Sequence, residues 1–243
     1  MTTIEIDPAW LAPTWFIDSD SPEVTAFVAE TIGDLDPEDH TAVAVALFRA
    51  VRDGIRYDPY GIDYAPEAFR ASRMTVAETG WCVSKSILLC AAARNAGIPA
   101  RLGFADVRNH LTSEKLRERL GTDLFAWHGY AELLLPDPGA LGGRRWFKLS
   151  TAFNIELCRR FGVKVLEFDG TDDALMHPYD EAGKRHMEYV RQRGTYDDLP
   201  LEEMVADFRE IYGDGIGDPN AAHTAEDAGD AAFSSSPGVT TPD

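Results

Sequence analysis

The sequence predicts an α+β fold in which helices come first along the chain and pack on an antiparallel sheet that follows. Apolar residues recur at helical spacing in the first hundred residues. Two apolar runs further on, 125–135 and 144–151, are joined by a loop rich in proline and glycine, which is typical of a β-hairpin. Helices followed by strands, without strict alternation, favour an α+β domain.

The composition excludes several classes of protein. The chain has 243 residues, 44% of them hydrophobic, and a formal net charge of −18. This charge argues against a nucleic-acid partner and against docking on an anionic membrane, because both carry negative charge. The longest apolar run, 87–93, is too short to span a bilayer, and the N-terminal residues lack the features of a secretory signal. We expect a cytoplasmic protein.

The cysteine count and the missing motifs narrow the chemistry further. Three scattered cysteines, without a Cys-x-x-Cys pair, predict neither a disulfide framework nor a zinc site. Phosphate-binding glycine motifs, Gly-x-Ser-x-Gly and His-Glu-x-x-His do not occur in the sequence. We therefore expect reduced thiols and no metal or cofactor.

The chain divides into three expected parts. Residues 1–36 form an N-terminal extension packed on the core, and 37–212 form the main domain with C-terminal helices. Residues 213–243 hold five glycines, three prolines and six acids but no lysine or arginine. Such a segment cannot offset its ordering entropy, so we expect an acidic, disordered tail.

Three helices are expected early in the chain. A serine followed by proline predicts a helix over 22–32, because proline fits the first helical position. Apolar spacing predicts a second helix over 37–53 and a third over 82–96. The third ends at Gly97, which accepts the left-handed cap conformation, and Pro99 cannot continue it.

The remaining elements follow from local patterning. Expected strands cover 99–107, 125–135, 144–151 and 163–168, and expected helices cover 112–120, 154–161, 180–192 and 201–211.

One cysteine stands apart from the others. Cys82 follows Gly80-Trp81 and occupies the first turn of the expected helix over 82–96. The free N–H groups of a helix start favour a thiolate, so we expect a lowered pKa and a nucleophilic sulfur. Cys90 and Cys158 lie in helix interiors and are expected to be small core residues.

A thiol nucleophile needs a base, and His128 is the best candidate. It lies near the start of the strand over 125–135, and pairing across the hairpin brings residues 150–154 opposite it. That stretch offers Ser150, Thr151 and Asn154 to orient the imidazole but no carboxylate. An amide can fill this place, as the Cys-His-Asn triad shows. His110, on a loop, is the rival base.

These residues resemble the transglutaminase-like superfamily over about residues 40–155. The resemblance rests on five stretches. Two of them are the glycine and cysteine at which a helix begins and the segment that follows the end of this helix. The others are the strand that carries the histidine, the strand after it and a helix that precedes the cysteine. The matching stretches are Gly80-Trp-Cys-Val-Ser-Lys-Ser, Ala92-Ala-Arg-Asn-Ala-Gly-Ile-Pro-Ala-Arg, Trp127-His-Gly-Tyr-Ala-Glu-Leu, Trp146-Phe-Lys-Leu-Ser-Thr and Ala50-Val-Arg-Asp-Gly-Ile-Arg-Tyr.

The resemblance implies a papain-like core with Cys82 as nucleophile and His128 as base. Ser150 stands where the family usually carries the aspartate that orients the histidine. We expect Ser150 to take this role with support from Asn154, while Asn154 alone or an acid from elsewhere in the chain are the alternatives.

The implied reaction is acyl transfer or hydrolysis at a peptide bond or a glutamine carboxamide, through a thioester. The expected partner is a peptide or protein substrate, and the sequence does not indicate an oligomeric state. Trp81 and Trp127 flank the two reactive residues, where they either wall the substrate cleft or serve as plain core aromatics. The alternative function, suggested by Ser150, is a non-catalytic member that binds peptides in the same cleft.

Overall fold

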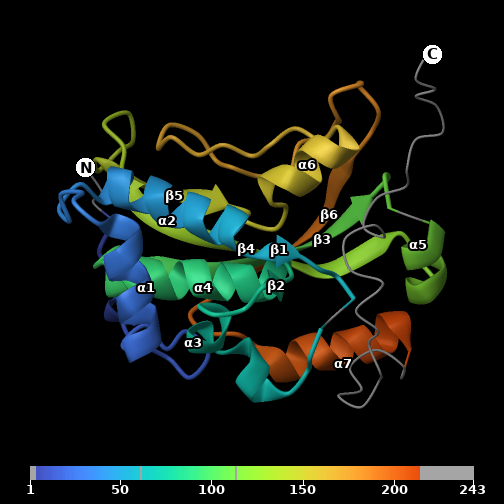
Figure 1. Cartoon of the computed structure of the whole chain (residues 1–243), viewed down its shortest axis with the longest axis horizontal. Coiled ribbons are helices and arrows are strands. Elements are labelled where there is room, and N and C mark those ends of the chain that lie inside the picture. The colour runs from blue at the N-terminus through green and yellow to red at the C-terminus, as the bar shows by residue number, and fades with distance from the viewer. Residues whose placement is uncertain (1–3, 61, 113, 214–243) are drawn as a thin grey trace.

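The computed structural model describes residues 4–60, 62–112 and 114–213 and has the α+β architecture that the sequence predicts (Figure 1). The expected tail at 213–243 lies outside the described residues, apart from Gly213. No helix in the described ranges is long and apolar enough to cross a bilayer.

The helices and strands follow one another in a simple order. The helices are α1 (Pro22–Ile32), α2 (His40–Gly54), α3 (Ala71–Met74), α4 (Cys82–Asn95), α5 (Glu114–Leu120), α6 (Ile155–Phe161) and α7 (Leu201–Tyr212), with short 3-10 helices at Pro8–Trp10 and Pro66–Phe69. The strands are β1 (Arg56–Tyr57), β2 (Thr79–Gly80), β3 (Ala100–Asn109), β4 (Leu124–Pro136), β5 (Arg144–Leu149) and β6 (Met187–Tyr196).

Helix α4 is the centre of the core. It is buried from Cys82 to Arg94, and it contacts α1, α2 and α3 as well as β3 and β4. A helix that is apolar nearly all round belongs in an interior of this kind. Figure 1 shows α4 and α7 below the strands and α6 above them.

The main sheet is antiparallel with the strand order β5-β4-β3-β6, and β1 and β2 form a separate parallel pair. The expected hairpin is confirmed as β4 and β5, which pair from Ala131–Leu149 to Pro136–Arg144. Because this ladder ends at Leu149, β5 does not cover the part of β4 that carries residues 124–130.

The sequence prediction is wrong for two segments. The helix expected over 180–192 is replaced by irregular chain and β6, because pairing of β6 with β3 outweighs the helical preference of its charged residues. The strand expected over 163–168 has no ladder partner. Its apolar residues Val163, Leu166 and Phe168 are buried all the same, which explains the misleading strand-like pattern.

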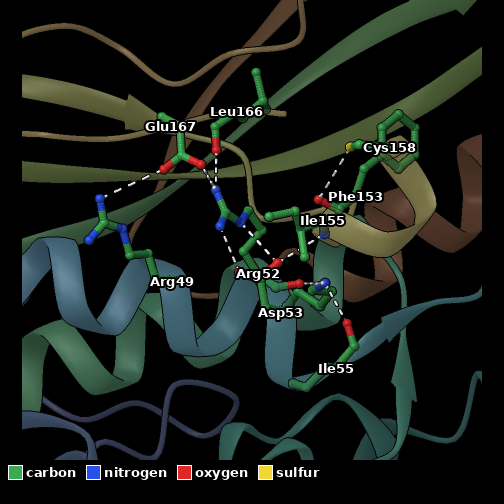
Figure 2. Close-up of polar contacts among 10 residues, drawn as sticks. Arg49, Arg52, Asp53, Ile55, Phe153, Ile155, Cys158, Leu166 and Glu167 are labelled. Carbon is green, nitrogen blue, oxygen red and sulfur yellow. Dashed lines mark hydrogen bonds and ion pairs between the residues drawn. The ribbon is translucent and has the colours of Figure 1, made fainter. Parts of the chain in front are cut away.

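Polar contacts fix the end of α2 against the start of α6. The carboxylate of Asp53 accepts hydrogen bonds from the Arg52 side chain and, at 2.9 Å, from the Ile155 N–H (Figure 2). The Arg52 guanidinium also donates to the Leu166 carbonyl and pairs with Glu167. The start of α6 and the segment that follows this helix are thereby held against α2.

A buried lysine ties the first turns of α4 to the same region. Lys85 Nζ donates to the carbonyls of Arg52 at 2.9 Å, Ile55 at 2.7 Å and Ala152 at 3.1 Å. Three acceptors match the three donors of an ammonium group, although burial lowers the pKa of Lys85 to about 7. Lys85 therefore connects three parts of the fold: helix α4, the end of α2 and the loop after β5.

We expect Lys85→Met to lower the free energy of unfolding by about 2–4 kcal/mol, because buried carbonyls lose their donors. Urea unfolding followed by circular dichroism measures this loss. Lys164→Met, at an exposed position, is the control and should change stability by less than about 0.5 kcal/mol. Equal stability of the two variants would contradict the structural role of Lys85.

Candidate active site

Cys82 lies where α4 begins and touches strand β4. Only 6% of the residue is exposed. The backbone N–H groups of Gly129, Val83 and Cys82 itself favour the ionised form of its sulfur. Two of these groups belong to the helix start, as the sequence predicts, and the third belongs to β4.

The expected low pKa of Cys82 is wrong in this structure. Burial removes the thiolate from water, and this effect, larger than that of the three N–H donors, raises the pKa of the thiol to about 11. Burial also raises the pKa of Cys90 to about 12 and that of Cys158 to about 11. At neutral pH all three sulfurs are therefore thiols.

His128 lies on β4 directly before Gly129, whose N–H reaches the Cys82 sulfur. It is 6% exposed, and burial lowers its pKa to about 4. Its Nε2 has no hydrogen-bond partner among the described residues. The imidazole is thus neutral at pH 7. Its Nε2 atom is available to accept a proton.

Gly129 allows helix and strand to approach this closely. A Cβ atom there would stand 3.0 Å from Val83 Cα and 3.4 Å from the Cys82 carbonyl oxygen. Both are backbone atoms at the start of α4, which cannot move aside without displacing the nucleophile. A side chain after the histidine would therefore have to displace the start of α4 by a few tenths of an ångström.

Three tyrosines lie within electrostatic range of the thiol, and the sequence analysis missed them. Burial, with a further contribution from Cys82, raises the pKa of Tyr57, Tyr189 and Tyr212. The Tyr189 ring also lies edge-on to the His128 ring, with centroids 6.2 Å apart. Tyr189 thus neighbours both reactive residues, and it lies in a segment for which the sequence predicted a helix.

The residues expected to orient His128 make no hydrogen bond to its ring. Ser150 and Thr151 are buried, and their hydroxyl oxygens have no partner among the described residues. Asn154 precedes α6, and its amide oxygen accepts the Tyr57 N–H at 3.2 Å. No carboxylate contributes to the pKa of His128.

The two tryptophans expected near the site, Trp81 and Trp127, differ in how deeply they are buried. Trp81 is half-buried and packs on Phe69 and Phe208, with ring centroids 6.1 and 6.3 Å away. Trp127 is fully buried and leaves no face for a substrate, so its expected binding role is wrong and it is a core aromatic.

His110, the alternative candidate for the base, lies beside a carboxylate. His110 Nε2 lies 3.1 Å from a carboxylate oxygen of Glu188. In the described part of the chain, no group of three or more histidine, cysteine, aspartate or glutamate side chains is arranged to hold a metal ion.

The raised pKa of Cys82 predicts slow alkylation of the native protein at neutral pH. With a pKa near 11, about one thiol in ten thousand is ionised at pH 7, against a few per cent for a free cysteine. Iodoacetamide labelling of the Cys82 peptide, followed by mass spectrometry from pH 6 to 11, should show an onset well above that of the urea-unfolded chain. An onset below pH 7 would reinstate the thiolate expected from the sequence.

Comparison with known proteins shows the family of this chain. The transglutaminase-like superfamily matches residues 26–151, more than half of the chain. A solved structure of a candidate cysteine protease from Cytophaga hutchinsonii matches with 15% identity and a TM-score of 0.43. The match covers 79% of this chain and 56% of that one, so this chain spans little more than half of that protein. No curated protein matches the sequence. The matched residues include both Cys82 and His128, and the chain belongs to the transglutaminase-like superfamily.

Proposed function

We propose that this chain catalyses acyl transfer or hydrolysis at an amide, either a peptide bond or a glutamine carboxamide. The observation that carries the proposal is the close approach of the start of α4 to Gly129, the residue after His128: a Cβ atom on Gly129 would lie 3.4 Å from the Cys82 carbonyl oxygen, and the Gly129 N–H favours the Cys82 thiolate. The substrate class is a peptide or protein, in keeping with the family to which the chain belongs.

The first step forms a thioester. The Cys82 sulfur attacks the amide carbonyl carbon while His128 takes the thiol proton, and the tetrahedral intermediate then expels an amine that receives this proton. The backbone N–H groups at the start of α4 stabilise the oxyanion, an effect typically worth about 10²–10³-fold. Water or a second amine then attacks the thioester, with His128 as base, and regenerates the thiol.

The resting protonation states decide how this step runs. A thiol with a pKa near 11 and an imidazole with a pKa near 4 form a neutral pair at pH 7. Proton transfer therefore accompanies attack on the bound substrate and does not precede it, which is general-base catalysis in the ordinary sense.

A non-catalytic peptide-binding protein is the second candidate. The observation that favours it is the lack of a carboxylate at His128, together with the burial of both reactive residues. Such a protein would bind the same peptides after Cys82→Ser and would form no thioester.

A panel of amides separates the two functions. Glutamine-containing peptides and short peptide amides are incubated with wild type and with Cys82→Ser, and release of ammonia, new amino termini and incorporation of a fluorescent amine are measured. Products that require Cys82 support the enzyme. Peptide binding by both proteins without any product would support the binding function.

A further inference from the structure

The backbone changes direction one residue before His128. Trp127 has a φ of 58° and is the one non-glycine residue with positive φ among those described. A bulky residue keeps this conformation only where its surroundings hold it. The β3–β4 ladder is regular from His128 to Leu133 but shifted before Trp127, where Val107 pairs with Phe125. The conformation of Trp127 therefore sets where His128 stands.

Two carboxylates and an arginine hold Trp127 in this conformation. Its backbone N–H donates to Asp106 Oδ1 at 3.1 Å, and its indole Nε1 donates to Asp207 Oδ2 at 2.9 Å. Arg193 donates to both carboxylates, and its guanidinium carbon lies 4.6 Å from the Trp127 ring centroid. The side chains of Arg193 and Asp106 are only 5% and 7% exposed, so this group of contacts is largely shielded from solvent.

Helix α7 fixes the residues just before Trp127 as well. The Tyr212 hydroxyl accepts the Ala126 N–H at 2.6 Å and donates to the Leu124 carbonyl at 3.1 Å. Asp207 comes from the same helix. The backbone at Leu124 and Ala126 is thus held from outside the sheet.

The His128 ring itself lacks such restraint. Its Nε2 has no hydrogen-bond partner among the described residues, and no carboxylate influences it. We propose that Asp106 and Asp207, joined by Arg193, position His128 through the backbone of Trp127 and take over the task of a carboxylate bonded to the imidazole. The role of His128 as base rests on the proposed function. Arg193 and Asp207 lie beyond the residues that match the family, 26–151.

The experiment replaces the acceptor of the Trp127 N–H. In Asp106→Leu we expect the strand to relax, the imidazole to gain solvent and its pKa to move from about 4 toward 6.5. Nuclear magnetic resonance of the protein labelled at histidine measures this titration, with His128→Asn to assign the signal. On an amide turned over by wild type, kcat should fall at least about tenfold while KM stays within about twofold.

Matched variants separate positioning from loss of stability. Asp106→Asn keeps an oxygen for the Trp127 N–H and should restore most of kcat and the low His128 pKa. Trp127→Phe removes the indole donor to Asp207 together with part of the buried ring, and it should shift the titration in the same direction, which also serves if Asp106→Leu does not fold. Glu132→Leu removes a buried carboxylate of β4 that pairs with Arg101 and should leave the His128 titration unchanged.

The outcomes are distinct. A His128 titration that is unchanged in folded Asp106→Leu or Trp127→Phe overturns the proposal, and so does an equal shift in Glu132→Leu. Failure of the proposed function gives another result: wild type turns over no amide, while the histidine titration, which needs no substrate, still responds to Asp106→Leu.

Discussion

Replacing Cys82 by alanine should abolish turnover and leave the fold intact. The sulfur is the atom that forms the thioester, so its loss should lower kcat/KM at least about 10³-fold. The residue is small and sits at the start of α4, so the loss of stability should be modest, about 1 kcal/mol. Activity on an amide from the panel, together with urea unfolding, checks both statements.

The other two cysteines provide the controls. Cys90 is fully buried in α4, and the Cys158 thiol donates to the Phe153 carbonyl at 3.9 Å, as Figure 2 shows. Neither contacts the site, so Cys90→Ala and Cys158→Ala should lose stability without losing more than about half of the activity of the folded protein. Full activity in Cys82→Ala, or its loss in Cys158→Ala, would move the nucleophile elsewhere.

Replacing His128 by asparagine should have the second largest effect. With a thiol pKa near 11, ionisation at pH 7 depends on a base that takes the proton during attack. General-base catalysis is typically worth about 10²–10⁴-fold, so kcat should fall within this range. The activity that remains should rise with pH toward 11, because hydroxide then ionises the sulfur directly.

His110→Asn is the matched control for this variant. His110 lies at the end of the sheet beside Glu188 and has no contact with Cys82, so kcat should stay within about twofold of wild type. A loss in His110→Asn comparable to that in His128→Asn would show that the wrong histidine is assigned.

Local signals predicted most of the fold. The Ser21 hydroxyl caps α1 by accepting the Val24 N–H at 3.3 Å, and the start of α4 at Cys82 is as expected. The hairpin of β4 and β5 was also predictable, because its loop residues fix the register. Each of these features depends on residues close together in the chain.

The errors concern long-range contacts. The helix expected over 180–192 rested on charged residues of moderate helix preference, whereas pairing with the neighbouring β3 makes residues 187–196 a strand. This error hid Tyr189 from the sequence analysis of the site. The pKa of Cys82 shows the same limit. The helix start predicts N–H groups that lower this pKa, but burial of the thiol by the surrounding fold outweighs them and raises it.

The orientation of His128 could not be predicted for the same reason. The hairpin pattern identifies only the residues opposite His128, namely Ser150, Thr151 and Asn154, and it does not say which acid from elsewhere in the chain comes close. The contacts that fix the backbone beside it come from β3, β6 and α7, including Asp207, which lies 80 residues from Trp127 in the chain.

Trapping of the acyl-enzyme tests the central claim most directly. Wild type and Cys82→Ala are mixed with a reactive amide or ester of a short peptide, quenched in acid, and analysed by intact mass and peptide mapping. We predict one added acyl group on the peptide that contains Cys82, removable by hydroxylamine, and none on Cys82→Ala. An acyl group on Cys90 or Cys158, or none on any cysteine for every substrate that is consumed, would contradict the account.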